Sequence, residues 1–397
     1  MRTHVLTRAL ALLGLLVSAL PVAAQQAEAP AGTPGWSVTP SVAAGAVYDS
    51  NVALANAPAS TGRTQSDRLL LVQPSAELEF VSPRTQFSSG YSGSLRRYVE
   101  FEQLNSFDQS AHISLRRLAS KHVTVSVSED YAQAPTTDEL ELNGVPFLRT
   151  GSRRNVVSGR VEARLSKFTD VGFSADHNRV SFERPGVRLT GGRVTGGHFD
   201  LNRRLRERLS VGAEYSIRFA EFGEAITREV VFHDAGGTVR YRVLERTSIG
   251  GAAGIAYLDE RTLGETRRGP YVRANVTQHT EHATFGASFD RTFVPSFGFG
   301  GSSRSEEVRG FVRMPIPQNR MYVQSSASWR KTEPFVLGGP LLETTTVRST
   351  FGYAVARYVR LEVFHALTRQ DSGVPGGDIN RNRIGTQVVI LQPMRIQ

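Results

Sequence analysis

The sequence predicts an all-β protein, a single transmembrane antiparallel β-barrel of about 18 strands with short periplasmic turns and longer extracellular loops. Three observations predict this fold. Apolar and polar residues alternate along many stretches, and the connections between these stretches alternate between short and long. In addition, no segment after the N-terminal region approaches the roughly 18 consecutive apolar residues of a transmembrane helix.

The N-terminus has the pattern of a secretory signal peptide. Arg2 and Arg8 provide positive charge, an apolar run covers residues 9–20, and the sequence continues as PVAAQQ with small residues before the expected cleavage site. We expect residues 1–24 to be this signal peptide. The protein is then delivered through the secretory pathway to the bacterial outer membrane.

The next segment, residues 25–35, is rich in Ala, Pro and Gly and is expected to be a flexible periplasmic leader. Residues 36–397 are expected to form the barrel. The chain contains no cysteine, which excludes a disulfide framework and thiolate metal sites.

Four stretches show the two-residue period of a β-strand most clearly. In LSVGAEYSIRF, residues 209–219, every odd-numbered residue is apolar or aromatic, and the others are Ser, Gly, Glu or Arg. The stretches NVVSGRVEARL, HATFGASFDRTF and MYVQSSASWRK repeat the pattern. Helical periodicity of comparable length does not occur.

The connections are sorted by length. Short polar turns are centred on 82–84, 119–121, 166–170, 204–208, 244–246, 279–282, 315–319 and 356–358. Longer segments rich in Gly, Pro and Asp are centred on 49–66, 99–106, 134–152, 183–191, 220–229, 259–268, 294–304, 334–343 and 370–379. Short turns on one rim and long loops on the other favour a membrane barrel over a soluble sandwich or propeller, whose strands are shorter. At the end of the chain, Pro393 is expected to end the last strand.

The apolar face of the strands is expected to contact lipid, with aromatic residues near the strand ends at the membrane interface. These aromatic residues are Trp36, Tyr48, Phe80, Tyr98, Tyr131, Phe168, Phe219, Phe293, Trp329 and Tyr358.

The polar face is expected to line the lumen. Its basic candidates are Arg160, Arg164, Arg218, Arg240, Arg242, Arg273, Arg309, Arg313, Arg330, Arg348 and Arg360. Acids on this face are fewer: Glu77, Glu79, Glu162, Glu214, Asp234, Asp290, Glu307 and Glu362. Arginines in a pore favour anions, because guanidinium groups bind carboxylates and phosphates bidentately. Alternatively, the arginines pair with acids across strands and only solvate the wall, as the alternation of Arg160, Glu162 and Arg164 suggests.

The formal net charge is +10, with 47 Lys and Arg against 37 Asp and Glu. In an exported protein this excess indicates an anionic partner: a polysaccharide, lipopolysaccharide phosphates or anionic solutes. Nucleic acid is not expected in that compartment. The sequence has no G-x-S-x-G motif, H-E-x-x-H motif or P-loop, so we expect neither an enzyme nor a cofactor or metal site.

Two short patterns resemble a known family. The first is GAVYDSNVALA, a Tyr-Asp-x-Asn-hydrophobic motif made by Tyr48, Asp49, Asn51 and Val52. The second is GDINRNRIGTQVVI, which contains Asn380, Arg381, Asn382, Arg383 and Gly385. Both resemble segments of the β-barrel porin-2-like family of bacterial outer-membrane barrels, many of which are encoded with exopolysaccharide synthesis and export genes. In this chain Tyr48 is expected at the outer interface, and Asp49, Ser50 and Asn51 are expected to start an external loop.

The resemblance implies a conduit in the export of an extracellular, acidic polysaccharide, with a periplasmic export-complex partner. Two other functions stay open from the residues alone. One is a general or anion-selective porin for small solutes, and the other is a closed barrel that acts as an interaction scaffold. An inward-folded loop at 134–152 would narrow the pore and favour small solutes over a polymer.

Overall fold

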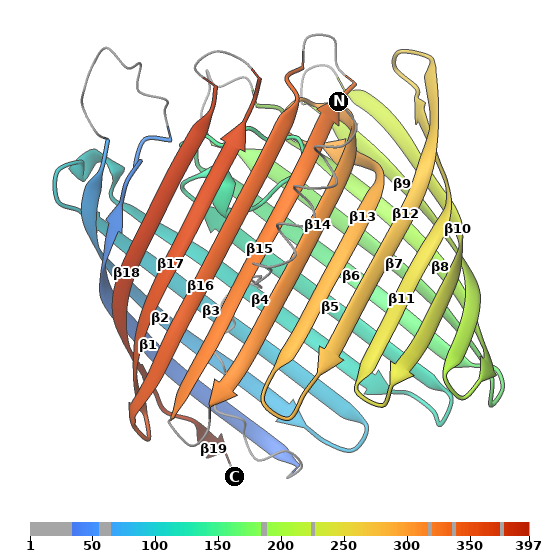
Figure 1. Ribbon diagram of the computed structural model, residues 1–397, viewed down its shortest axis with the longest axis horizontal. Helices are drawn as coiled ribbons and strands as arrows, with labels where there is room; N and C mark the ends of the chain where they lie inside the picture. The colour runs from blue at the N-terminus through green and yellow to red at the C-terminus, as the bar shows by residue number, and fades with distance from the viewer. Residues whose placement is uncertain are drawn as a thin grey trace.

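The computed structural model describes residues 34–54, 65–183, 189–223, 227–316, 320–335, 339–373 and 377–396. The expected signal peptide, residues 1–24, lies outside these ranges, as does the expected leader apart from residues 34 and 35. Within the described ranges the strands form one antiparallel sheet that closes on itself (Figure 1). No helix in this part of the chain is long and apolar enough to cross a membrane.

Eighteen strands form the ring in chain order, which confirms the fold class predicted from the sequence. They are β1 (Gly35–Asp49), β2 (Asp67–Val81), β3 (Thr85–Tyr98), β4 (Ser106–Leu118), β5 (Val123–Ala134), β6 (Ser152–Arg164), β7 (Thr169–Phe182), β8 (Gly192–Arg206), β9 (Leu209–Phe222), β10 (Arg228–Leu244), β11 (Thr247–Glu260), β12 (Glu265–His279), β13 (Thr284–Ser296), β14 (Gly301–Ile316), β15 (Met321–Pro334), β16 (Leu342–Ala356), β17 (Val359–Asp371) and β18 (Ile379–Leu391).

The barrel closes where β1 pairs with β18, from Ser41 opposite Leu391 to Asp49 opposite Arg383. β18 ends two residues before Pro393, which has no N–H to donate to a neighbouring strand. Pairing with β1 then resumes in a short strand, β19 (Met394–Ile396). Closure leaves no sheet edge along the seam between β1 and β18.

The two rims differ as the sequence pattern predicts. Turns as short as residues 207–208 and 245–246 lie at the lower rim in Figure 1. The upper rim carries the longer connections, including 99–105 with η2 (Glu102–Leu104) and 135–151 with η3 (Thr137–Glu139). Two predicted long loops are tighter than expected: the strands extend far enough to leave only 261–264 and 297–300 between them.

The outward face of the barrel carries large apolar side chains. Leu70, Phe173 and Ile255 are 53%, 56% and 63% exposed, and they alternate with residues that point inward. A barrel with an apolar exterior lies in lipid, because hydrogen bonds between neighbouring strands satisfy most of its backbone N–H and C=O groups. The pairing has a gap: β12 and β13 are bonded only from Val272 opposite Arg291 to His279 opposite Thr284. By the convention of outer-membrane barrels, we call the short-turn rim the periplasmic rim and the opposite rim the extracellular rim.

Two of the aromatic residues predicted for the membrane interface are buried instead. Tyr98 is 4% exposed and lies beneath the guanidinium of Arg149, 5.3 Å from its ring centroid. Phe293 is 5% exposed and packs edge-on against Phe335 at 5.5 Å between ring centroids. For Tyr98 the prediction is wrong because strand-end aromatic residues of either face look alike in the sequence. Phe293 shares the outward phase of Phe285, but β13 is not paired with β12 beyond Arg291, and the Phe293 ring lies against Gly269 of β12.

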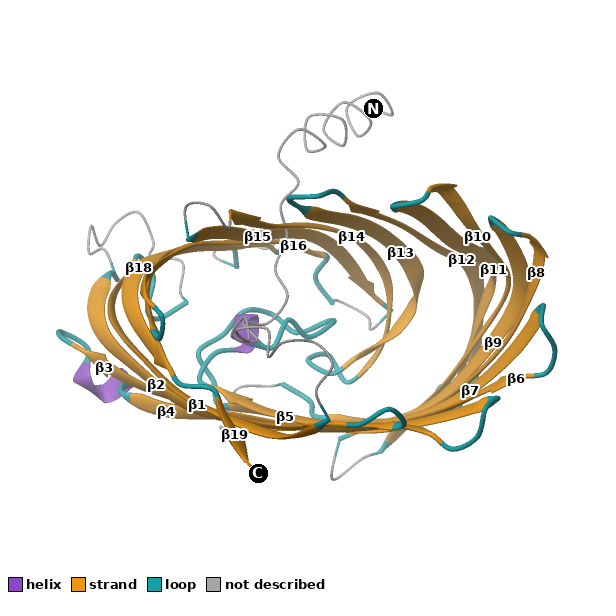
Figure 2. Cartoon of the chain, turned by 90° about the horizontal axis from the view of Figure 1, so that it is seen from below, coloured by secondary structure: helices purple, strands orange, loops and turns teal. Residues whose placement is uncertain are grey.

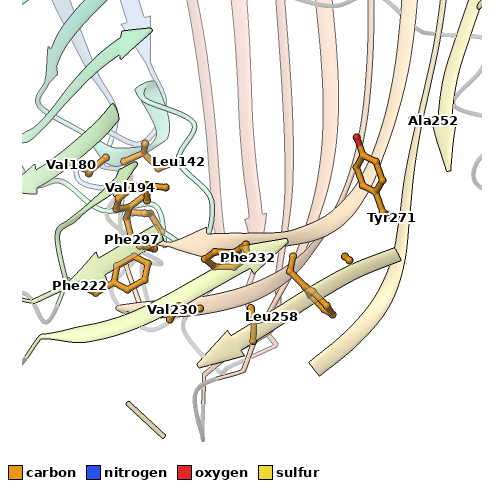
Figure 3. Close-up of a cluster of buried hydrophobic side chains, with 14 residues drawn as sticks. Leu142, Val180, Val194, Phe222, Val230, Phe232, Ala252, Leu258, Tyr271 and Phe297 are labelled. Carbon is orange, nitrogen blue, oxygen red and sulfur yellow. The ribbon is translucent and has the colours of Figure 1, made fainter. Parts of the chain in front are cut away.

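A buried apolar cluster lies inside the extracellular half of the barrel. It consists of Leu142, Val145, Val180, Val194, Ala220, Phe222, Val230, Phe232, Ala252, Ala256, Leu258, Tyr271, Phe293 and Phe297. Figure 3 shows Leu142 beside Val180 and Val194, with Phe297 next to them. We call this set the inner apolar cluster. It joins the inward face of β7–β11 to two extracellular connections, 135–151 and 297–300.

Candidate functional site

The connection between β5 and β6, residues 135–151, lies within the ring of strands (Figure 2). We call it the lumen loop. It is closed on itself around Thr137, whose N–H donates to the carbonyl of Leu148 at 3.0 Å and whose Oγ1 donates to the carbonyl of Pro146 at 2.7 Å. The Leu148 N–H in turn donates to Thr137 Oγ1 at 2.7 Å. Thr137 is fully buried, so the loop has a fixed internal structure.

One arginine of the closing seam holds the start of the lumen loop. Arg381 of β18 forms ion pairs with Asp49 of β1 at 2.6 Å and with Asp138 of η3 at 3.1 Å. All three side chains are at most 1% exposed. Burying one guanidinium between two carboxylates is favourable only when the hydrogen-bond geometry is good, and Arg381 uses its Nε, Nη1 and Nη2.

Glu139 makes the second anchor. Its carboxylate accepts hydrogen bonds from Arg96 of β3 and Arg383 of β18, each at 2.7 Å. Burial alone would raise the pKa of the Glu139 carboxyl, but the Arg96 and Arg383 guanidinium groups hold this pKa well below its usual range. We call the group Asp49, Arg96, Asp108, Asp138, Glu139, Arg381 and Arg383 the seam cluster.

The next residues of the lumen loop reach the wall formed by β14–β17. Glu141 pairs with Arg348 of β16 at 2.9 Å, and its carbonyl accepts from Arg330 of β15 at 2.8 Å. Glu141 has a φ of 49°, a left-handed conformation that costs a non-glycine residue about 1–3 kcal/mol and persists only where contacts impose it. Further along, the Phe147 N–H donates to Gln370 of β17 at 2.8 Å. The loop is thus bound to a wall that is remote in sequence from β5 and β6.

The tip of the lumen loop contacts the connection between β13 and β14. Gly144 has a φ of 63° and its carbonyl accepts from Ser296 Oγ at 3.4 Å. A Cβ at Gly144 would come within 1.7 Å of that Oγ, so only glycine fits this approach. Leu142 and Val145 on either side enter the inner apolar cluster. The tip therefore fills apolar space at the extracellular end.

Contacts between non-adjacent strands draw the wall together beside the lumen loop. Tyr271 of β12 donates to Glu214 of β9 at 2.5 Å, and Thr292 of β13 donates to Asp234 of β10 at 2.6 Å. Arg218 of β9 donates to the carbonyl of Phe293 at 3.0 Å. Each pair joins strands that lie three or four positions apart in the ring, so the wall curves sharply here. Together with the lumen loop, this curvature constricts the extracellular half of the lumen.

The eleven arginines singled out in the sequence lie on one strand face, that of the residues in contact with the lumen loop. Seven are in ion pairs: Arg160 with Glu162 and Asp200, Arg164 with Asp170, Arg218 with Asp234, Arg273 with Glu214 and Asp290, Arg309 and Arg330 with Glu307, and Arg348 with Glu141. Pairing with acids of the wall or of the lumen loop thus accounts for seven of the eleven, and in five of these the acid lies on another strand.

The other four differ. Arg360 lies against Tyr322 and Glu362, and Arg313 lies over the ring of Phe311 at 5.9 Å. Arg240 and Arg242 form no ion pair within the described residues.

The periplasmic half of the lumen contains a polar cavity of about 580 Å³ lined by inward residues of β4–β12. Arg160, Arg240 and Arg273 lie on its wall, as do Asp200 and Glu214. Among the described residues, no group of three or more His, Asp or Glu is arranged to hold a metal ion.

The two family-like patterns meet at the seam. The N–H of Ser50 donates to the Asn382 carbonyl at 2.9 Å, and the N–H of Asn382 donates back to Ser50 Oγ at 2.8 Å. In addition, Asn51 Nδ2 donates to the Asn380 carbonyl at 3.2 Å. Tyr48 is 44% exposed on the outer face, whereas Asp49 and Val52 are fully buried. The long connection between β1 and β2 begins at Ser50 and Asn51, as expected, but Asp49 is not part of it. Asp49 is the last residue of β1, and the next two residues stay bonded to β18.

Sequence reasoning missed the acidic residues of the lumen loop. Asp138, Glu139 and Glu141 stand together in a segment, TDELELNGVPF, that is otherwise largely uncharged. The signal that could have found them is the excess of inward arginines over inward acids. Unpaired guanidinium groups on a lumen wall need carboxylates from elsewhere, and an acidic loop is a source.

Neither a family model nor a curated protein matches this chain. Solved structures with a similar fold include OpdQ of Pseudomonas aeruginosa, at a TM-score of 0.42 and 8% identity over 91% of this chain and 98% of that chain. OccK5 (OpdH) of the same organism has a TM-score of 0.42 and 10% identity over 90% and 98%. The siderophore receptor PirA of Pseudomonas aeruginosa has a TM-score of 0.45 and 9% identity over 91% and 80%. The likeness is one of barrel fold.

Proposed function

We propose that the protein is an outer-membrane channel for small anionic solutes, constricted by the lumen loop. The observation that carries this proposal is the buried contact of Arg381 with both Asp49 and Asp138, which fixes the loop inside the barrel. A loop tied to the closing seam narrows the lumen without depending on any external partner.

Three sets of contacts support small solutes over a polymer. The seam cluster, the Glu141 contacts with β15 and β16, and the inner apolar cluster all hold the lumen loop across the extracellular half. A polymer passing through would need all three to break together. Removing one partner from a single buried ion pair already costs about 3–5 kcal/mol.

The charge of the wall supports anions over cations. Within the described residues, Arg240 on the polar cavity has no ion pair, and Arg273, which is about half exposed, has only longer contacts of 3.4 and 3.8 Å with acids. Such guanidinium groups offer weak and repeated contacts to carboxylates and phosphates, and a conducted ion must bind weakly enough to leave.

A second candidate is the conduit for an acidic extracellular polysaccharide, with a periplasmic partner of an export complex. The meeting of the two family-like patterns at Ser50 and Asn382 favours it. It requires the lumen loop to leave the barrel, for instance when a partner binds the periplasmic rim. Lipopolysaccharide and outer-membrane lipid would surround the barrel in either case.

Single-channel conductance in planar bilayers, with reversal potentials in a KCl gradient, tests both candidates. We compare the wild type with D138N/E139Q, which removes two carboxylates of the seam cluster, and with the control E162Q/D170N, which removes two exposed carboxylates of the wall. The proposal expects small anion-selective steps in the wild type and control and larger steps in D138N/E139Q.

Other outcomes are equally informative. Cation-selective steps contradict the proposal. Large steps that an added acidic polysaccharide blocks support the export conduit instead. No conductance in any of the three proteins, each shown to be folded, leaves a closed barrel that acts as an interaction scaffold.

A further inference from the structure

The periplasmic mouth of the barrel has a cavity of about 840 Å³ beside the turns that join β8 to β9 and β10 to β11. Six arginines line it: Arg204, Arg206, Arg208, Arg240, Arg242 and Arg246. Among the described residues of its wall, two are acids, Glu207 and Glu245. The volume falls in the range of about 300–1,000 Å³ that is usual for small-molecule sites.

These arginines differ from those elsewhere on the inner wall. Deeper in the barrel, Arg160 and Arg218 each have an acid at 2.7 Å. At the mouth, within the described part of the chain, only Arg246 has an ion pair, a solvent-exposed contact with Glu281 at 3.7 Å. Five guanidinium groups therefore share one cavity without an ion pair to any carboxylate that the structure describes.

The strand register explains how the cavity stays open between the arginines. Ser210 of β9 lies opposite both Arg204 of β8 and Arg240 of β10, and Gly250 of β11 lies on the far side of Arg240. Ser248 lies opposite Arg242 in the next row. Serine and glycine leave room for the guanidinium groups, and each serine hydroxyl is a further hydrogen-bond donor.

The spacing of the strands sets the distance between the charges. Arg204 and Arg240 stand two strands apart, about 10 Å, while Arg240 and Arg242 are about 7 Å apart along one strand. Like charges this close repel one another unless an anion lies between them. A single carboxylate can bind only one or two of these guanidinium groups. The spacing of the arginines therefore suits a solute with several anionic groups.

We propose that this cavity is a binding site for a small solute that carries two or more phosphate or carboxylate groups. This site deepens the proposed function. Passage of the bound solute through the barrel rests on the proposed channel, whereas binding at the periplasmic mouth does not require conduction. Phosphates and carboxylates share the chemistry that guanidinium groups recognise, so both are tested.

Isothermal titration calorimetry on the full-length folded protein in detergent tests the site. The probes are inorganic tripolyphosphate and citrate, with orthophosphate as the reference of lower charge. The test variant is R240Q/R242Q. The control is R117Q/R203Q, which removes two arginines of the same rim that share the outward face with Leu115 and Leu201. Circular dichroism verifies the β-barrel fold of each variant.

We expect at least one polyvalent probe to bind about tenfold tighter than orthophosphate, and R240Q/R242Q to weaken it by about tenfold or more, with R117Q/R203Q unchanged. Preference for tripolyphosphate or for citrate identifies which anionic group the natural solute carries. Equal binding by wild type and R240Q/R242Q, or no advantage of either probe over orthophosphate, overturns the proposal. Because the assay needs no membrane, a barrel that binds but does not conduct refutes the proposed channel and leaves the site intact.

Discussion

Asp49 and Arg381 are 332 residues apart in the sequence and form a buried ion pair of 2.6 Å across the seam where the barrel closes. The same guanidinium binds Asp138 of the lumen loop. Closure of the ring and the position of the loop therefore depend on one arginine. The relationship has consequences for stability, for pH dependence and for conduction.

Removal of the Asp49 charge should destabilise the whole barrel. In D49N, Arg381 keeps Asp138 but loses its bidentate partner in a site with no access to water. We expect the free energy of unfolding to fall by about 3–5 kcal/mol, measured by urea unfolding in lipid vesicles with tryptophan fluorescence. The control is D170N, which breaks an exposed pair with Arg164 at 3.6 Å and should cost at most about 1 kcal/mol. Equal losses in the two variants would show that Arg381 does not depend on Asp49.

Acid should loosen the lumen loop through Glu139. The pKa of Glu139 in the folded protein lies below the value of about 4.3 for an unperturbed glutamate. The ion pairs of its carboxylate therefore stabilise the lumen loop fully above that value, and this stabilisation is lost as the pH falls through the lower folded pKa. We expect single-channel conductance to be constant near neutral pH and to rise below about pH 4.

The E139Q variant removes this titration. We expect it to show a higher conductance than the wild type at neutral pH and a flatter profile on acidification. The control is E281Q, which changes an exposed glutamate in a periplasmic turn and should leave the profile as in the wild type. An E139Q profile that rises with acid as the wild-type profile does would assign the acid response to other carboxyl groups.

The strands could be predicted because their signal is local. In LSVGAEYSIRF, the apolar and polar residues alternate along a single strand, and the structure places Tyr215 and Phe219 outward as that alternation requires. Turn residues are local as well, so the order of short and long connections followed from the sequence. The strand count and the closed ring then followed from counting repeats.

The lumen loop could not be predicted in the same way, because the contacts that hold it are not local. Asp138 and Arg381 are 243 residues apart, and no sequence period connects them. The inner apolar cluster was missed for a related reason. In EVVFHD, Val230 and Phe232 occupy inward positions next to the outward Val231, so apolar residues fall on both faces. A barrel strand with two apolar faces packs against something inside the barrel, and the sequence alone does not identify it.

Truncation inside the barrel should cost more than truncation on its lipid face. Leu258 is fully buried in the inner apolar cluster, whereas Ile255, on the same strand, is largely exposed on the outer face. L258A leaves a cavity that the wall and the loop cannot fill, and we expect a loss of about 2–5 kcal/mol in urea unfolding. I255A should cost less, because lipid chains move into the vacated space. A larger loss for I255A would mean that the cluster contributes little to stability.

Neutralising Glu141 and neutralising Arg348, which form an ion pair, should shift the ion selectivity of the channel in opposite directions. The two groups meet at 2.9 Å inside the lumen, and each is about one-third exposed. E141Q frees the Arg348 guanidinium for permeating anions, so the reversal potential in a KCl gradient should move toward that of chloride. R348Q leaves the Glu141 carboxylate unpaired and should move the potential toward that of potassium. If both variants shift the potential in the same direction, the pair acts by holding the loop in place and its charges do not contact the permeating ion.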